Sequence, residues 1–157
     1  MEDLVDRADA WAEAAHDGQS RKGSGEPYVE HPRRVAAMVA SLGVPKHVVA
    51  AALLHDVLED TDLTYRDLDS EFGLPVAELV LELTDVYTPN RRPSWDRAMR
   101  KKAEAERYQS LSPHARLIKI CDVLDNAKDA QENLGEEAER YLEEKRRVVQ
   151  VLLGGRA

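Results

Sequence analysis

The sequence contains a single cysteine, and this scarcity excludes two kinds of stabilising site. Cys121 is the one thiol in the chain, so the chain can form neither an intramolecular disulfide bond nor a zinc cluster built on several thiolates. Because Cys121 lies in an apolar run, we expect an inert buried thiol and not a nucleophile. Any metal bound by this chain must therefore rely on nitrogen and oxygen ligands.

Long apolar segments and an excess of positive charge are also missing. No window approaches the roughly 18 uninterrupted apolar residues of a membrane span, and residues 1–10 lack the apolar core of a signal peptide. We therefore expect a cytoplasmic protein with no membrane partner. The formal net charge is −8, from 22 Lys and Arg against 30 Asp and Glu. This balance argues against DNA or RNA as a partner, because binding to phosphate backbones needs a broad basic surface.

Helical periodicity, in contrast, covers nearly the whole chain. Apolar residues recur three and four positions apart, as in Leu4, Ala8 and Trp11, and no run with a period of two stands out. Glycine, proline and capping residues divide the chain into about eight expected helices. They span residues 2–16, 32–42, 46–58, 64–72, 75–86, 94–110, 113–132 and 136–153. Since the length suits one domain, we predict a single all-α helical bundle over residues 1–157.

Two histidines and two aspartates form a pattern that suits a metal ion. His31 stands near an expected helix start. His55 and Asp56 end one apolar run, and Asp122 ends another. Each is unremarkable alone, but buried carboxylates are costly without a partner, and a cation is the simplest partner for them. Imidazole and carboxylate together suit Mn, Fe, Ni, Zn or Mg in a site that keeps positions open for water.

A second pair of acids follows the first. Glu59 and Asp60 each come four residues after a member of the His55-Asp56 pair, so on one continuous helix they lie on the same face. Three or four carboxylates so close together repel one another unless a cation neutralises them. The pattern therefore predicts a dense acidic cluster around a metal.

With these motifs, the sequence resembles the HD superfamily of metal-dependent phosphohydrolases, whose H…HD…D ligand pattern falls on the four residues above. It is more similar still to the hydrolase domain of RelA/SpoT-type alarmone enzymes, and above all to their stand-alone form, the small alarmone hydrolases. The likeness is carried by residues 15–32 (AHDGQSRKGSGEPYVEHP), 51–61 (AALLHDVLEDT), 72–85 (FGLPVAELVLELTD) and 119–129 (KICDVLDNAKD). Because it covers essentially the whole chain, we expect no synthetase or regulatory domain.

This resemblance implies hydrolysis of guanosine 3′-diphosphate 5′-di(tri)phosphate, (p)ppGpp, at the 3′ position, with release of pyrophosphate and usually with Mn²⁺. It implies that Glu59 and Asp60 are the catalytic pair. The implied metal ligands are His31, His55, Asp56 and Asp122.

The resemblance also implies residues that recognise the nucleotide. Arg21 and Lys22 correspond to residues that contact the base, Asn126 to a residue that contacts the ribose, and Tyr141 to a tyrosine that lines the pocket. The chain departs from the bifunctional enzymes around the last metal ligand, where Val123 and Asp125 replace an arginine and a histidine, and its first long loop has an extra glycine. From these departures we expect looser discrimination between guanine and adenine.

A basic segment stands out in this acidic chain. Residues 91–102 hold six cations against one anion. This segment is either a solvated helix face or a surface that receives the phosphates of the substrate, whose approach an acidic metal site would otherwise slow. On the second interpretation Arg91 and Arg92 bind phosphate. Lys119 is a further candidate, although it is equally suited to pair with a nearby carboxylate.

Other interpretations stay open at this point. The chain is also compatible with an HD phosphohydrolase that acts on an adenosine alarmone, on the 2′-phosphate of NADPH or on a nucleoside monophosphate. A non-catalytic HD module that senses an alarmone is a further alternative, although such a module needs no water-activating metal. The remaining histidines and the two tryptophans are expected to be structural, as core or groove residues: His16, His47, His114, Trp11 and Trp95.

Overall fold

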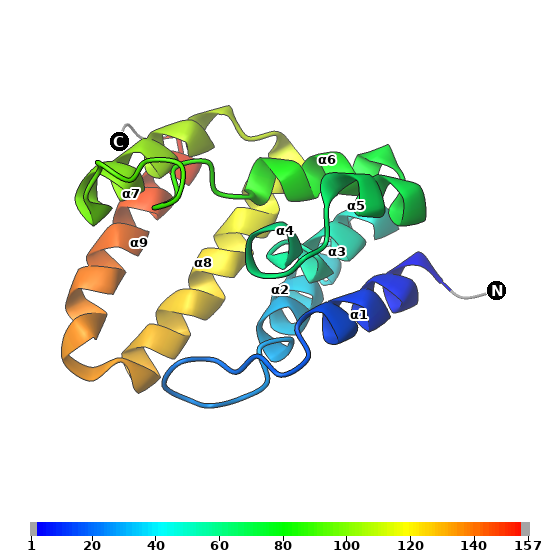
Figure 1. Ribbon diagram of the computed structural model, residues 1–157, viewed down its shortest axis with the longest axis horizontal. Coiled ribbons are helices and arrows are strands. Elements are labelled where there is room, and N and C mark those ends of the chain that lie inside the picture. The colour runs from blue at the N-terminus through cyan, green and yellow to red at the C-terminus, as the bar shows by residue number, and fades with distance from the viewer. Residues whose placement is uncertain (1–2, 155–157) are drawn as a thin grey trace.

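The computed structural model describes residues 3–154, and in that range the protein is built from α-helices without named strands (Figure 1). The helices are α1 (Leu4–Ala15), α2 (Glu30–Ala40), α3 (Lys46–Leu53), α4 (Val57–Asp60), α5 (Tyr65–Phe72), α6 (Leu74–Leu83), α7 (Arg97–Arg107), α8 (Pro113–Asn133) and α9 (Ala138–Leu152). Two short 3₁₀ turns, Tyr108–Ser110 and Gly135–Glu137, precede α8 and α9. The predicted all-α class is confirmed.

Helix α8 is the spine of the molecule. It packs against α2, α3 and α6 on one side and against α9 on the other, and α7 packs on α9. In Figure 1 the helices α1 to α6 therefore form one half of the bundle, and α7 and α9 form the other half. A residue on α8 can face either half, which makes this helix a natural place for a site between them.

Helix α3 is the centre of the core. Every residue from Val48 to Leu54 is buried, so this helix is apolar all round and is enclosed by α1, α2, α6 and α8. Burial at its end extends to His55, which is 2% exposed. The core thus delivers a histidine into the interior at the point where the helix stops.

The prediction of one helix over residues 46–58 is wrong. Helix α3 ends at Leu53, three residues form a turn, and α4 starts at Val57. The imidazole Nδ1 of His55 lies 2.7 Å from the carbonyl oxygen of Ala52. This carbonyl is one of those at the end of a helix that lack a backbone partner within the helix. Consequently the acids of α4 do not continue the helix that carries His55. The ends of the other helices differ from expectation by at most three residues.

Two irregular loops flank the spine. The first, residues 16–29, is pinned by an isolated bridge between Ser20 and Pro27, and its Gly23 lies against Asn133 at the end of α8. The second, residues 84–96, is held by the buried Glu104 of α7, whose Oε1 accepts hydrogen bonds from the amides of Val86 and Tyr87. Both long connections are thus ordered by specific contacts.

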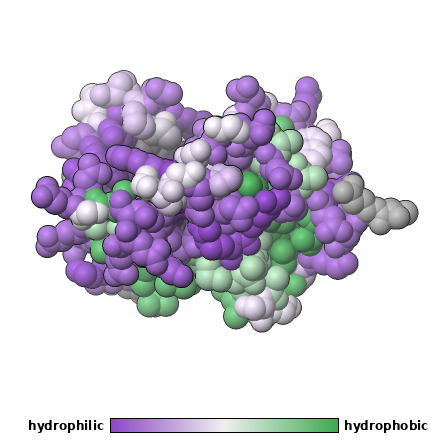
Figure 2. All heavy atoms as spheres, turned by 90° about the horizontal axis from the view of Figure 1, so that it is seen from below, coloured by the Kyte–Doolittle hydropathy of each residue, from purple (hydrophilic) through white to green (hydrophobic). Residues whose placement is uncertain are grey.

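The surface matches the charged composition of the chain. The face in Figure 2 is mainly hydrophilic, with hydrophobic side chains gathered in limited patches. Among the described residues, no helix has the length and apolar character needed to cross a membrane.

Candidate functional site

Side chains from three distant segments converge at the side of α8. His31 comes from α2, His55 from the turn between α3 and α4, and Asp122 from α8. The Nε2 atoms of His31 and His55 lie 2.8 and 3.2 Å from the same oxygen, Oδ1 of Asp122. All three residues are buried, and their ligand atoms lie within 4.8 Å of one another. This cluster has the size and donor types of a metal site.

Asp56 completes the predicted set of four. Its Oδ2 lies 3.1 Å from Nε2 of His55 and 3.7 Å from Nε2 of His31. The same oxygen accepts a hydrogen bond of 2.7 Å from the hydroxyl of Tyr28, which lies in the first loop. The structure therefore brings together all four residues of the H…HD…D pattern.

The hydrogen bonds of the two imidazoles test whether a cation fits. Nδ1 of His31 faces Oδ2 of Asp125 at 2.6 Å, and Nδ1 of His55 faces the carbonyl of Ala52. A proton on each Nδ1 leaves both Nε2 lone pairs directed at carboxylate oxygens, an arrangement that needs positive charge between them. The donor set thus fits a divalent metal ion.

The electrostatics of these residues lead to the same conclusion. Burial disfavours the charged form of His55, yet the carboxylates of Asp56 and Asp122 outweigh burial and raise its pKa well above the usual value. Burial likewise opposes ionisation of Asp122, but Lys119 and His55 outweigh it and hold the pKa of this carboxyl well below its usual range. The centre is therefore built to hold ionised carboxylates around a positive charge.

Glu59 and Asp60 lie on α4 beside this centre. Oε1 of Glu59 accepts a hydrogen bond of 2.5 Å from the amide of Asp85, and the carbonyl of Asp60 accepts one of 2.9 Å from Gln19. Partial desolvation, followed by the charges of Asp85 and Asp56, raises the pKa of Glu59 to about 8. Partial desolvation and the charge of Asp56 raise the pKa of Asp60 to about 6. Both carboxyls are therefore able to exchange protons near neutral pH.

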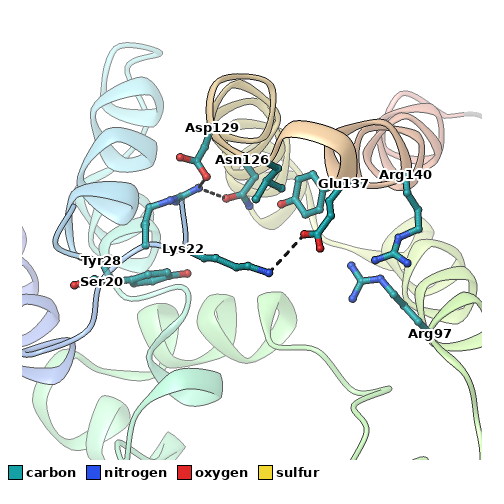
Figure 3. Close-up of a pocket in the computed structure, with 11 residues that line it drawn as sticks. Ser20, Lys22, Tyr28, Arg97, Asn126, Asp129, Glu137 and Arg140 are labelled. Atoms are coloured by element: carbon teal, nitrogen blue, oxygen red, sulfur yellow. Dashed lines mark hydrogen bonds and ion pairs between the residues drawn. The ribbon is translucent and has the colours of Figure 1, made fainter. Parts of the chain in front are cut away.

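Figure 3 shows a cavity of about 350 Å³, and two of its lining residues, Tyr28 and Asn126, donate hydrogen bonds to Asp56 and Asp122 of the metal cluster. Its lining includes all four residues predicted to recognise a nucleotide: Arg21, Lys22, Asn126 and Tyr141. Figure 3 shows Lys22 reaching toward Glu137, with which it pairs at 3.5 Å, while Arg97 and Arg140 lie together at the other end. The volume is in the range of small-molecule sites.

Arg21 is anchored and is not a free guanidinium. It is only 8% exposed, and its Nη2 donates to Oδ1 of Asn126 at 3.1 Å and pairs with Oδ2 of Asp129 at 3.0 Å. The amide of Asn126 in turn donates to Oδ1 of Asp122 at 3.0 Å. A continuous chain of hydrogen bonds therefore joins the lining of this cavity to a residue of the metal cluster.

The basic segment divides into several environments. Arg91 is exposed and lines a second cleft of about 470 Å³ that also contains Glu59 and Asp60. The guanidinium of Arg92 lies 5.5 Å from the ring centroids of both Tyr87 and Trp95, which stack on each other. These cations are thus neither a uniform solvated face nor equally available to a ligand.

Of the two alternatives for Lys119, phosphate or a nearby carboxylate, the structure shows the carboxylate: its Nζ pairs with Oδ2 of Asp122 at 3.0 Å. Cys121 is buried, and burial followed by the charge of Asp122 raises the pKa of its thiol. Trp11 packs edge-on against Phe72 and contributes to the core. Trp95 instead stacks near the surface.

The remaining histidines lie outside the cluster formed by the described residues. His16 faces Gln19 at 3.0 Å and packs on the ring of Tyr28, so it supports the first loop. His47 and His114 pack on each other with ring centroids 6.0 Å apart.

Comparison with known proteins decides the family. A family model described as an HD domain matches residues 8–157. This chain is an HD domain protein. It is 39% identical over 130 residues to a guanosine-3′,5′-bis(diphosphate) 3′-pyrophosphohydrolase of Aquifex aeolicus, and the match covers 79% of the HD domain chain but only 17% of that relative.

Shorter relatives match over most of their length. The HD domain is 39% identical over 126 residues to guanosine-3′,5′-bis(diphosphate) 3′-pyrophosphohydrolase MESH1 of Drosophila melanogaster, covering 78% of this chain and 67% of the relative. Among solved structures, it resembles a metazoan ortholog of SpoT that is described as hydrolysing ppGpp. That likeness has a TM-score of 0.86 and 33% identity, and it covers 100% of this chain and 89% of the other.

Several side chains of the HD domain site were not found from the sequence. Tyr28 bonds a residue of the metal cluster, Asp125 bonds another, and Lys145 of α9 lies with its Nζ 4.8 Å from the ring centroid of Tyr141. The spacing offered a weak signal, since Asp125 follows Asp122 by three residues and Lys145 follows Tyr141 by four. Helical spacing alone does not show that a residue belongs to a site, however, and nothing in the sequence indicated which face of α8 packs against α2.

Proposed function

We propose that this HD domain hydrolyses the 3′-pyrophosphate of (p)ppGpp, giving GDP or GTP and pyrophosphate, and that residues 1–157 act as one hydrolase domain. The observation that carries this proposal is the hydrogen-bond chain from Arg21 through Asn126 to Asp122, which joins the nucleotide-sized cavity to the metal cluster. The printed activities of the similar proteins support the same reaction.

We propose that His31, His55, Asp56 and Asp122 hold the metal, and that the metal is Mn²⁺. When bound, such an ion polarises a phosphate oxygen and lowers the pKa of a coordinated water. Burial and the charges of Asp85 and Asp56 raise the pKa of Glu59 to about 8, which suits it to protonate the departing 3′-oxygen. Asp60, with a pKa raised to about 6, is ionised at neutral pH and is suited to accept a proton from water.

The two cavities suggest how the substrate lies. The base and ribose would occupy the cavity lined by Arg21, Lys22, Asn126 and Tyr141, and the phosphates would face the second cleft. Arg97 lines both cavities, which supports a ligand that extends from one to the other. In this arrangement the exposed Arg91 binds phosphate directly. Arg92 attracts the phosphates from its position beside the stacked rings of Tyr87 and Trp95. Positioning of this kind is the main requirement of phosphoryl transfer.

In this arrangement Lys119 is less available to bind phosphate than its charge alone suggested. Its ammonium already bonds Oδ2 of Asp122, so a phosphate group would compete with this carboxylate for Lys119. A small-molecule nucleotide as the partner, in place of DNA or RNA, is supported by the net charge of −8. A cytoplasmic location remains a prediction.

The decisive experiment compares nucleotides under one set of conditions. Purified protein is incubated with Mn²⁺ and with ppGpp, its adenosine counterpart, NADPH or GMP, and the products are separated by chromatography. We expect the highest kcat/KM for ppGpp, with GDP and pyrophosphate as products. A tenfold or greater preference for NADPH or GMP would overturn the alarmone assignment.

Variants of the acidic pair distinguish an enzyme from a sensor. Glu59→Gln and Asp60→Asn should keep the metal and lower kcat by roughly 10²–10⁴-fold, the usual contribution of a general acid or base. Glu132→Gln, an exposed change of equal charge on α8, serves as the control. Binding of ppGpp without turnover by the wild type would instead favour a non-catalytic module.

A further inference from the structure

Asp125 occupies a position between the metal cluster and the first loop. It lies one helical turn after Asp122 on α8, and its Oδ2 faces Nδ1 of His31 at 2.6 Å, on the side of the ring opposite Nε2, which faces Oδ1 of Asp122. The residue is only 7% exposed. A side chain so placed meets the back of His31, and its Oδ2 also lies 3.7 Å from Nη1 of Arg21.

Arg34 of α2 donates to both oxygens of Asp125. Nε of Arg34 donates to Oδ1 at 2.7 Å and Nη2 donates to Oδ2 at 3.2 Å, a two-point clamp. Arg34 is itself held from the first loop, because Nη2 and Nη1 donate to the two oxygens of Glu26 at 2.6 and 3.2 Å. The orientation of the Asp125 carboxylate is thus fixed from two segments.

We propose that Asp125 is a positioning residue for the metal centre, which fixes the ring of His31 with its proton on Nδ1 so that Nε2 remains free to bind the metal. Arg34 and Glu26 hold Asp125 in the required orientation. This inference rests on the proposed metal site, but it does not depend on which nucleotide is hydrolysed. Carboxylates in this position behind a metal-binding histidine typically change metal affinity 10–100-fold.

The two histidines differ in how they are held, and this makes the inference testable. Nδ1 of His55 faces a backbone carbonyl, that of Ala52, which no side-chain substitution removes. Nδ1 of His31 depends on Asp125 alone among the described residues. A substitution at Asp125 therefore disturbs one ligand while the other stays in place.

The experiment measures Mn²⁺ affinity in the absence of nucleotide, by the electron paramagnetic resonance signal of free Mn²⁺. Asp125→Asn retains an acceptor for Nδ1 but loses the charge, so it should weaken Mn²⁺ binding by about 10–100-fold, and Asp125→Ala should weaken it at least as much. Glu132→Gln, with the same change of charge on the same helix, should bind Mn²⁺ like the wild type. Asp129→Asn, which loses the shortest ion pair of Arg21, should also keep its Mn²⁺ affinity.

A second readout separates positioning from general damage. If Asp125 acts through the metal, saturating Mn²⁺ should restore most of the kcat of Asp125→Asn, whereas a misfolded variant stays inactive. Should Asp125→Asn fail to fold, Arg34→Gln tests the same clamp and should weaken Mn²⁺ binding by about tenfold.

Wild-type Mn²⁺ affinity in whichever of these variants folds would overturn the inference. Weakened Mn²⁺ binding in a protein whose wild type leaves ppGpp intact would overturn the proposed function and leave this inference standing.

Discussion

Lys119 and Lys145 lie in the same interior region but have different partners. Lys119 bonds Asp122, which outweighs the effect of burial and raises the pKa of its ammonium. Lys145 has no carboxylate within 4.0 Å among residues 3–154, and its Nζ lies over the ring of Tyr141. Burial, followed by the charge of Lys119, lowers the pKa of Lys145 to about 8. The ammonium of Lys145 is therefore less well compensated than that of Lys119.

Because its pKa is lowered, Lys145 should reduce the stability of the folded state wherever it is protonated. An unfolded lysine titrates near pH 10.4, so between about pH 8 and that value the unfolded chain binds more protons than the folded one, and stability rises with pH. Below about pH 8 Lys145 is protonated in both states, so the full cost of burying its charge lowers the free energy of unfolding. Lys145→Met should therefore raise the free energy of unfolding at pH 7 and flatten its rise between pH 8 and 10, as measured by urea unfolding. Lys102→Met, at an exposed position, is the control; lower stability of Lys145→Met at pH 7 would contradict the assignment.

At the scale of elements, the sequence predicted the helices well and the site only in part. The H…HD…D pattern indicated the four clustered residues, although only His55 and Asp56 are adjacent in the chain. The break after Leu53 was not predictable, since no glycine or proline stands between Ala50 and Asp60 and the interruption depends on tertiary contacts. The contact between Asp125 and His31 was not predicted for a similar reason: it depends on how α2 packs against α8.

The docking of the first loop on α8 gives an element-scale prediction. Gly23 has φ +96°, and an added Cβ would lie 2.8 Å from Cβ of Asn133, whereas Gly25 has φ +75° with nothing within 4 Å. Both Gly→Ala changes strain the backbone by about 1–3 kcal/mol. Only Gly23→Ala should also push the loop off α8, so it should raise the KM for ppGpp well beyond Gly25→Ala. Equal KM values in the two variants would show that contact with Asn133 does not position Arg21 and Lys22.

At the scale of the molecule, the metal cluster joins segments that are distant in the chain. Its residues come from α2, the turn after α3, and α8, the helix between the two halves of the bundle. A bound ion therefore stabilises the folded chain by linkage, by about 2.7 kcal/mol at a concentration of one hundred times Kd. We expect Mn²⁺ to raise Tm and a chelator to lower it. His55→Ala should lose this response in a thermal melt, and a Tm increase equal to that of the wild type would argue against the site.

The lone thiol described above has a practical consequence for the whole fold. Cys121 is 4% exposed and directly precedes Asp122 on the central helix. A thiol reagent reaches such a sulfur only when that part of the helix opens, so the labelling rate of the native protein measures the free energy of that opening. Asp122 is one of the proposed metal ligands, so bound metal should suppress this opening, and the labelling rate of Cys121 would then report how much of the site is occupied.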